Sequence, residues 1–229
     1  MILVPVKNLS AAKQRLAAVL DQASRTALAQ AMLHDVLSTL HNWKNRPQVA
    51  IVTSDLYAVK LAEDFKFEII PDPANPGETG AIEMATRQCV ERGADSTLVI
   101  PADIPLIETW ELEEILKHAP VEGGVLVPAA DGRGTNAAFR RPANLFPLRF
   151  GNDSFKPHHA AAQATGKPCI VLKLPGIALD VDNPADLQQL ISLPGETRAQ
   201  GLAREYIRAA TAGVGTDAPP VRPRNGATS

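Results

Sequence analysis

Short apolar segments alternate with segments of helical periodicity along most of the chain. Residues 2–6 are apolar at every position, which is typical of a strand buried on both faces of a sheet. Leu33, Val36, Leu37 and Leu40 recur three or four positions apart and predict a helix over 25–41 that begins after Ser24 as N-cap. The chain therefore opens with a buried strand followed by a long amphipathic helix.

The same alternation continues to residue 210. Further strands are predicted at 49–53, 67–70, 97–100, 125–128, 136–140 and 169–174. Further helices are predicted at 55–66 with Asp55 as N-cap, at 80–92 with Thr79 as N-cap, at 108–118, 154–165 and 198–210, and from Pro184 onward. Prolines and a glycine between 71 and 77 exclude regular structure there.

This order of elements predicts an α/β fold with a mostly parallel sheet and helices on both faces. At 229 residues, one large domain or two small ones would fit. We expect a domain over 1–210 and a disordered tail over 211–229, which is rich in Gly, Pro and Thr. Ligands of such sheets bind beyond the carboxyl ends of the strands, which directs attention to the residues after Val6, Thr53, Ile100 and Leu179.

Composition narrows the class of partner. Lys and Arg total 23 and Asp and Glu total 25, and aromatic residues make up only 4% of the chain. Neither the charge balance nor the aromatic content favours nucleic acid as a partner. The longest apolar runs are too short to span a bilayer, the first residues do not resemble a signal peptide, and the two cysteines lie 80 positions apart (Cys89, Cys169). We therefore expect no membrane association and a cytoplasmic protein whose cysteines are reduced.

Three cations follow the first predicted strand. Lys7, Lys13 and Arg15 lie at a strand-to-helix turn, where backbone N–H groups also favour an anion such as a polyphosphate. Solvated basic residues at the start of a helix would show the same spacing. The glycines of a P-loop or of a GxGxxG loop are missing, so neither of those phosphate-binding loops is present.

Three acids follow later strands. Asp103 lies between Pro101 and Pro105 after the strand at 97–100, and its oxygens suit Mg²⁺, although a turn-forming Asp is equally consistent. Asp180 and Asp182 bracket one residue, so in an extended segment both carboxylates point to the same side. Asp182 or Asn183 could instead be the N-cap before Pro184.

A candidate anion pocket precedes the helix at 154–165. Gly151 and Ser154 combine a flexible turn with a hydroxyl at a helix start, where a phosphate or carboxylate binds well, although Ser154 could be a plain N-cap. Thr135 and Asn136 follow two glycines that allow close backbone approach to a ligand, although loop mobility explains those glycines equally well. His158 and His159 lie on the same helix and could reach that ligand, but they lack a third partner for a zinc site.

These residues resemble the CofC/FbiD family, the guanylyltransferases of coenzyme F420 biosynthesis. The resemblance runs from residue 2 to about 193 and rests on Val4-Pro-Val-Lys7 with Ala12-Lys-Gln-Arg-Leu16, Pro101-Ala-Asp-Ile-Pro-Leu106, Gly134-Thr-Asn136, Phe150-Gly-Asn-Asp-Ser-Phe155 with His158, and Asp180-Val-Asp-Asn-Pro-Ala-Asp-Leu187. It implies a nucleotidyltransferase fold of the GT-A-like, Rossmann-like type, a three-layer sandwich with a mostly parallel mixed sheet. It also implies transfer of GMP from GTP to a three-carbon phospho-acid with release of pyrophosphate.

The resemblance implies roles for the candidate residues. Mg²⁺ would be the cofactor, held by Asp103, Asp180 and Asp182, and the phospho-acid would be held by Thr135, Gly151 and Ser154. Asp103, Lys7, Lys13 and Arg15 would form the catalytic set, with the three cations on the triphosphate. The acceptor stays open among phosphoenolpyruvate, 2-phospho-L-lactate and 3-phospho-D-glycerate, and a homodimer is compatible with the family.

Two other functions stay open. One is a nucleotidyltransferase that acts on a sugar phosphate or on molybdopterin, although those enzymes usually begin with a glycine-rich loop that the segment 7–10 lacks. The other is a non-catalytic nucleotide-binding protein on the same fold. The presence of all three acids argues for an enzyme.

Overall fold

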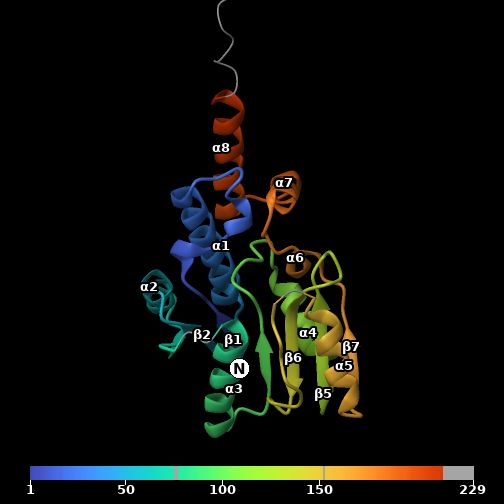
Figure 1. The fold of residues 1–229 in the computed structure, drawn as a ribbon. Helices are drawn as coiled ribbons and strands as arrows, with labels where there is room; N and C mark the ends of the chain where they lie inside the picture. Colours follow the sequence, from blue (N-terminus) through green and yellow to red (C-terminus); the bar gives the residue numbers. More distant parts are fainter. Residues whose placement is uncertain (75–76, 152, 214–229) are drawn as a thin grey trace, which may run out of the picture.

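The computed structural model describes residues 1–74, 77–151 and 153–213. Within these residues seven strands form one sheet in the order β3–β2–β1–β4–β6–β5–β7 (Figure 1). Their bounds are β1 Ile2–Pro5, β2 Val49–Thr53, β3 Glu68–Pro71, β4 Thr97–Val99, β5 Gly123–Pro128, β6 Thr135–Arg141 and β7 Cys169–Val171.

The direction of β6 decides which segments meet at one edge of the sheet. β6 is antiparallel to both β4 and β5, whereas the other neighbouring pairs are parallel. The amino end of β6 therefore lies beside the carboxyl ends of the parallel strands. The predicted mostly parallel mixed sheet is confirmed.

Helices cover both faces of this sheet and complete three layers. Their bounds are α1 Gln22–Asn42, α2 Leu56–Asp64, α3 Glu78–Glu91, α4 Thr109–His118, α5 Phe155–Ala164, α6 Pro175–Ala178, α7 Pro184–Ser192 and α8 Arg198–Gly213. One apolar core joins the sheet to α1, α2, α4, α7 and α8, and a second joins its other face to α3 and α5. α6 lies just above β5 and β6 in Figure 1, and α7 and α8 lie in the upper part of the picture.

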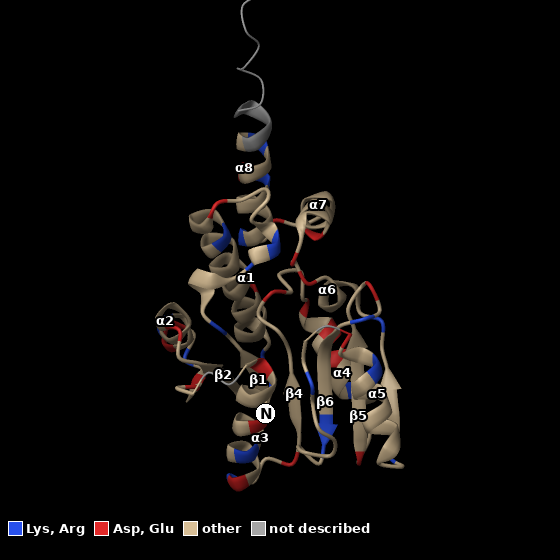
Figure 2. Ribbon diagram, viewed as in Figure 1, with Lys and Arg blue, Asp and Glu red and all other residues tan. Residues whose placement is uncertain are grey.

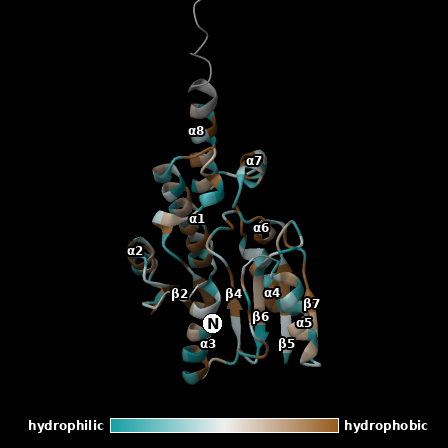
Figure 3. Cartoon of the chain, viewed as in Figure 1, coloured by the Kyte–Doolittle hydropathy of each residue, from teal (hydrophilic) through white to brown (hydrophobic). Residues whose placement is uncertain are grey.

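The sequence of β1 explains its central place. Ile2 and Val4 belong to the first core and Leu3 to the second, because successive side chains of a strand point to opposite faces. Figure 3 shows hydrophobic residues along the strands and on α1, where helix and sheet pack. In Figure 2, β1 and β4 carry no charged residue.

Within the described part of the chain, no helix has the length and apolarity to cross a membrane.

Two predicted helix starts are wrong. α1 begins at Gln22, three residues before the predicted start, and its N-cap is Asp21, whose carboxylate accepts from Ser24 N at 2.8 Å. α3 begins at Glu78 after Gly77, and the Thr79 hydroxyl instead accepts from Phe150 N at 2.9 Å. Asp21 thus takes the capping position predicted for Ser24, and the Thr79 side chain bonds to another segment.

The carboxyl-terminal part differs from the prediction in two places. The predicted strand at 169–174 ends at Val171, and the short α6 follows it. α8 continues to Gly213, three residues past its predicted end. The rest of the predicted tail, 214–229, lies outside the described residues.

Candidate active site

A cavity of about 930 Å³ opens at the carboxyl edge of the sheet. Segments that are far apart in sequence form its wall, namely the turns after β1 and β4, the start of β6, the turn before α5 and the segment after α6. Every residue predicted for the site lines it, namely Lys7, Lys13, Arg15, Asp103, Thr135, Gly151, Ser154, Asp180 and Asp182. The topological rule therefore predicted correctly that these residues lie around one cavity at this edge of the sheet.

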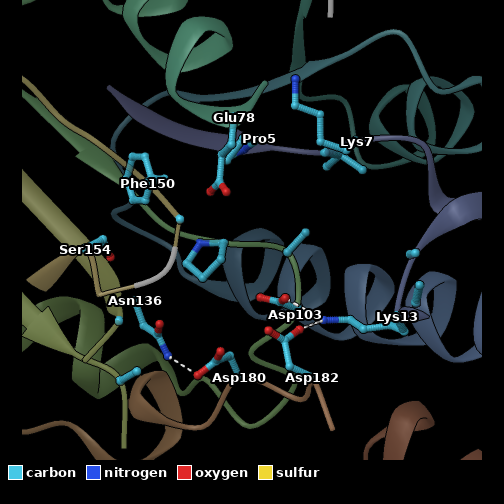
Figure 4. Close-up of a pocket in the computed structure, with 18 of the residues that line it drawn as sticks. Pro5, Lys7, Lys13, Glu78, Asp103, Asn136, Phe150, Ser154, Asp180 and Asp182 are labelled. Carbon is cyan, nitrogen blue, oxygen red and sulfur yellow. Dashed lines mark hydrogen bonds and ion pairs between the residues drawn. The ribbon is translucent and has the colours of Figure 1, made fainter. Parts of the chain in front are cut away.

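Backbone contacts bring the three acids together. Asp103 follows β4, and its carbonyl oxygen accepts from Val181 N at 3.2 Å, so the segment with Asp180 and Asp182 lies against it. The N-cap of α7 is Asn183, whose side chain accepts from Ala185 N and Asp186 N. The Asp182 carboxylate is thus not used as a cap and faces the cavity (Figure 4).

The ammonium of Lys13 lies between two of these carboxylates. Its Nζ lies 2.6 Å from Asp103 Oδ2 and 2.8 Å from Asp182 Oδ1, as the dashed lines of Figure 4 show. Lys13 adopts a left-handed backbone with φ 56°, which costs about 1–2 kcal/mol for a non-glycine residue. Strain of this kind persists where surrounding interactions compensate it, often at functional sites.

The third acid is held by the side chain of Asn136, a residue for which the sequence predicted only backbone contacts to a ligand. Asn136 Nδ2 donates to Asp180 Oδ1 at 2.9 Å and also to the carbonyl oxygens of Ile177 and Ala178. The amide therefore ties the amino end of β6 to the segment after α6. In the sequence, the role of Asn136 was indicated only by the motif Gly134-Thr-Asn136 at the start of β6.

Negative charge exceeds positive charge around Lys13. Burial is the main cause that raises the pKa of Asp180 to about 6. The hydrogen bond from Asn136 lowers this pKa, and the charges of Asp103 and Asp182 raise it further. Burial, and then the charge of Asp103, raises the pKa of Glu78 to about 7. Burial acts to lower the pKa of Lys13, but the two carboxylates outweigh it and hold that pKa above its usual value.

This donor set fits a divalent cation. An ammonium held between two carboxylates marks a position that favours positive charge, and Mg²⁺ commonly takes only one or two protein carboxylates while phosphates and water complete its shell. In the described residues, no group of three Asp, Glu, His or Cys side chains is placed to hold a metal by itself. The cavity therefore offers carboxylates for a cation whose shell the substrate completes.

The other two cations have different surroundings. Lys7 points away from the acids (Figure 4), and its Nζ lies 2.9 Å from Asp72 Oδ2. Arg15 NH1 lies 3.7 Å from Asp182 Oδ2 with its side chain 63% exposed. The structure thus places Lys13 and Arg15 beside the three predicted acids. Lys7 pairs instead with Asp72, which was not predicted from the sequence.

A pair of hydroxyls forms the opposite wall of the cavity. Ser154 precedes α5 but makes no side-chain cap; its Oγ accepts from Thr135 N at 3.0 Å. Thr135 Oγ1 lies 2.9 Å from His158 Nδ1, and His158 Nε2 accepts from Arg149 N. Since Nε2 is an acceptor, the neutral ring carries its proton on Nδ1 and donates it to Thr135.

Both hydroxyls are therefore acceptors toward the protein. Their own protons stay available to a ligand in the cavity, which suits an anion. Gly151 completes this wall with φ 124°, a conformation that residues with a side chain rarely adopt. His158 is buried behind Thr135, and His159 stacks on Phe155; neither is among the residues that line the cavity.

Fold and site together define a class. A structure of a putative nucleotide-diphospho-sugar transferase from Desulfovibrio desulfuricans G20 superposes with a TM-score of 0.74 at 18% identity and covers 92% of this chain and 96% of that one. At this identity the match shows the same fold. The chain therefore has an α/β fold of the nucleotide-diphospho-sugar transferase type, with its acid-lined cavity at the carboxyl edge of the sheet.

The family follows from the sequence comparisons. The family described as "Guanylyl transferase CofC like" matches residues 1–222, and the chain belongs to it. A phosphoenolpyruvate guanylyltransferase of Conexibacter woesei is 32% identical over 90% of this chain and 96% of its own length. A 3-phospho-D-glycerate guanylyltransferase of Colwellia psychrerythraea is 34% identical over 84% and 91%.

A third relative extends the range of acceptors. A 2-phospho-L-lactate guanylyltransferase of Methanothermobacter thermautotrophicus is 33% identical over 90% of this chain and 88% of its own length. The family indicated by the sequence motifs is thereby confirmed.

Proposed function

We propose that this protein transfers GMP from GTP to a three-carbon phospho-acid, with release of pyrophosphate, in coenzyme F420 biosynthesis. The observation that carries the proposal is the cavity itself, in which a cluster of carboxylates lies opposite two hydroxyls that each accept a hydrogen bond from the protein and keep a proton to donate to a ligand. The names of relatives in the family, all guanylyltransferases of three-carbon phospho-acids, support it.

The reaction needs no strong general base. An oxygen of the acceptor phosphate attacks the α-phosphorus of GTP, the bond from that phosphorus to the oxygen bridging to the β-phosphate breaks, and pyrophosphate leaves with that oxygen. The attacking oxygen is already anionic, so the protein has to bring two anions together and offset the charge that develops.

The carboxylates are the proposed ligands of the cofactor. Asp103, Asp180 and Asp182 are proposed to hold Mg²⁺, which would supply charge neutralisation on the phosphates. Lys13 and Arg15 lie beside these acids and add positive charge where the triphosphate would lie. Lys13 is held in place by its two carboxylate partners, so its ammonium is positioned before the substrate arrives.

The hydroxyl wall accounts for the acceptor. Ser154 and Thr135 each accept a hydrogen bond from the protein and can donate one to a phosphate or carboxylate. A three-carbon phospho-acid carries both kinds of anionic group, and either can accept a hydrogen bond from this wall. We keep the prediction of a cytoplasmic protein that binds GTP and this small acid, with a homodimer as a compatible state.

The first experiment is pyrophosphate release with Mg²⁺. GTP, ATP, CTP and UTP are each combined with phosphoenolpyruvate, 2-phospho-L-lactate and 3-phospho-D-glycerate. We expect a signal with GTP and one of the three acids. A signal only with a sugar phosphate would favour the other type of nucleotidyltransferase, and nucleotide binding without any turnover would favour a non-catalytic protein.

Replacing Ser154 with alanine tests the acceptor wall. The change removes one donor to an anionic ligand, and we expect the KM for the phospho-acid to rise about tenfold or more while the KM for GTP changes little. Steady-state kinetics with each substrate varied in turn measure both values. Ser192→Ala, an exposed serine on α7, serves as the matched control, and an equal rise in both KM values for Ser154→Ala would refute the assignment.

A further inference from the structure

A second cavity adjoins the first at the turn after β1. Its volume is about 600 Å³, and it shares residues Val6, Lys7, Asn8 and Leu9 with the first cavity. Its other walls come from the segments that follow β2 and β3 and from Thr26 and Gln30 of α1. A molecule that spans both cavities would therefore pass along the turn that carries Lys7.

Asp72 supplies the polar edge of this cavity. Its side chain is only 5% exposed, and its Oδ2 accepts from Lys7 Nζ at 2.9 Å. Within the described residues no donor is placed on Oδ1. Asp55, the other carboxylate of the cavity, already accepts from the backbone N–H groups of Leu9, Tyr57 and Ala58.

Asp72 is therefore the carboxylate of this cavity whose Oδ1 can accept a hydrogen bond from a ligand. A buried carboxylate gains most from a ligand that presents N–H donors. Because Lys7 holds one oxygen in place, the orientation of the other is fixed before a ligand arrives.

Two exposed apolar side chains supply a surface beside this edge. Leu56 is 85% exposed and Tyr57 is 38% exposed at the start of α2, and both line the cavity. Exposed apolar side chains at the rim of a polar cavity are typical of a ligand site. A flat aromatic ligand could cover both while its edge meets Asp72.

We propose that this second cavity holds the guanine base of GTP and that Asp72 and Lys7 read its edge. Guanine presents two kinds of N–H donor, at N1 and at the 2-amino group, which match the Asp72 carboxylate, and an O6 acceptor, which matches the Lys7 ammonium. Adenine presents a lone pair at N1 and an amino group at position 6, so both contacts would be reversed. This inference rests on the proposed function and assigns Lys7 to the base instead of the triphosphate.

The test compares GTP with inosine 5′-triphosphate (ITP), which lacks only the 2-amino group. Calorimetric titration with Mg²⁺ gives the Kd of each nucleotide for the wild-type protein and for Asp72→Asn. We expect the wild type to bind GTP about tenfold or more tightly than ITP, since a hydrogen bond to a charged group is worth about 1.5–3 kcal/mol. In Asp72→Asn this ratio should fall toward one.

Two further variants complete the design. Asp64→Asn removes an exposed carboxylate at the far end of α2 and should keep the wild-type ratio. Leu56→Ala changes a surface residue and should weaken GTP and ITP binding about equally, by a few-fold. It therefore tests the cavity even if Asp72→Asn does not fold, which circular dichroism and thermal unfolding would reveal.

The outcomes separate this inference from the proposed function. Guanylyl transfer by the wild type with an unchanged GTP-to-ITP ratio in folded Asp72→Asn, or a wild-type Kd in Leu56→Ala, would overturn the base site and leave the reaction standing. Selective GTP binding that Asp72→Asn abolishes, without pyrophosphate release from any substrate pair, would support the base site and count against the reaction. Absence of both binding and turnover would overturn both.

Discussion

Replacing Asp103 with asparagine is expected to lower kcat by about 10²–10³-fold, since the loss of one group that stabilises transition-state charge costs about 2.7–4 kcal/mol. Asparagine keeps the shape of the side chain and removes its charge. Lys13 loses one of its two carboxylate partners and keeps Asp182, so the fold should survive. Pyrophosphate release, measured across a titration of Mg²⁺ at saturating GTP and phospho-acid, should show both a lower rate and a higher Mg²⁺ requirement.

The control for this variant flanks the same strand, β4. Asp95 precedes β4, at the opposite end from Asp103, and its side chain is 77% exposed beside Arg141. Asp95→Asn should therefore keep the wild-type kcat and Mg²⁺ requirement. If Asp103→Asn turns over at the wild-type rate with a wild-type Mg²⁺ requirement, Asp103 is not part of the metal site.

The second prediction is that the free energy of unfolding depends on pH through His158, which is buried behind Thr135. Burial, and then the charge of Arg140, lowers the pKa of His158 to about 4, against about 6.5 in an unfolded chain. The unfolded state binds more protons between these values, so stability rises with pH in that window and is lost as pH falls from about 6.5 to 4. Between pH 7.5 and 5.0 this group should lower the free energy of unfolding by about 2 kcal/mol.

Urea denaturation of the wild type and of His158→Gln at both pH values measures this contribution. The variant loses the hydrogen bonds of the ring at both pH values, so the informative quantity is the difference between the two pH values. We expect that difference to be smaller in His158→Gln by about 2 kcal/mol. His159→Gln, which changes the partly exposed neighbour on the same helix, should retain the wild-type difference, and an unaltered difference in His158→Gln would contradict a buried neutral imidazole.

The gathering of the candidate residues around one cavity was predictable because it depends on local patterns and one topological rule. Apolar runs such as 2–6 and 97–100 mark strands, and the carboxyl ends of parallel strands meet at one edge. Lys7 and Asp103 each follow such a run. Their presence in one cavity could thus be inferred without knowing any side-chain contact.

The partners of these residues were not predictable in the same way. Lys13 pairs with acids 90 and 169 positions away, and Lys7 pairs with an acid 65 positions away. Spacing along the chain carries no information about such pairs, because they depend on how loops from different strands pack. For the same reason Ser154 is correctly placed before α5 but bonds to Thr135 instead of capping the helix.

The sequence alone determined the alternation of strands and helices, the α/β fold and the edge of the sheet at which the acids gather, because hydrophobic periodicity and chain direction are properties of neighbouring residues. The tertiary structure decided which two acids hold Lys13, which carboxylate pairs with Lys7, and that the hydroxyl protons of Thr135 and Ser154 stay available to a ligand. These choices follow from hydrogen bonds and ion pairs between segments far apart in the chain, whose strength depends on distance and burial that only the folded molecule sets.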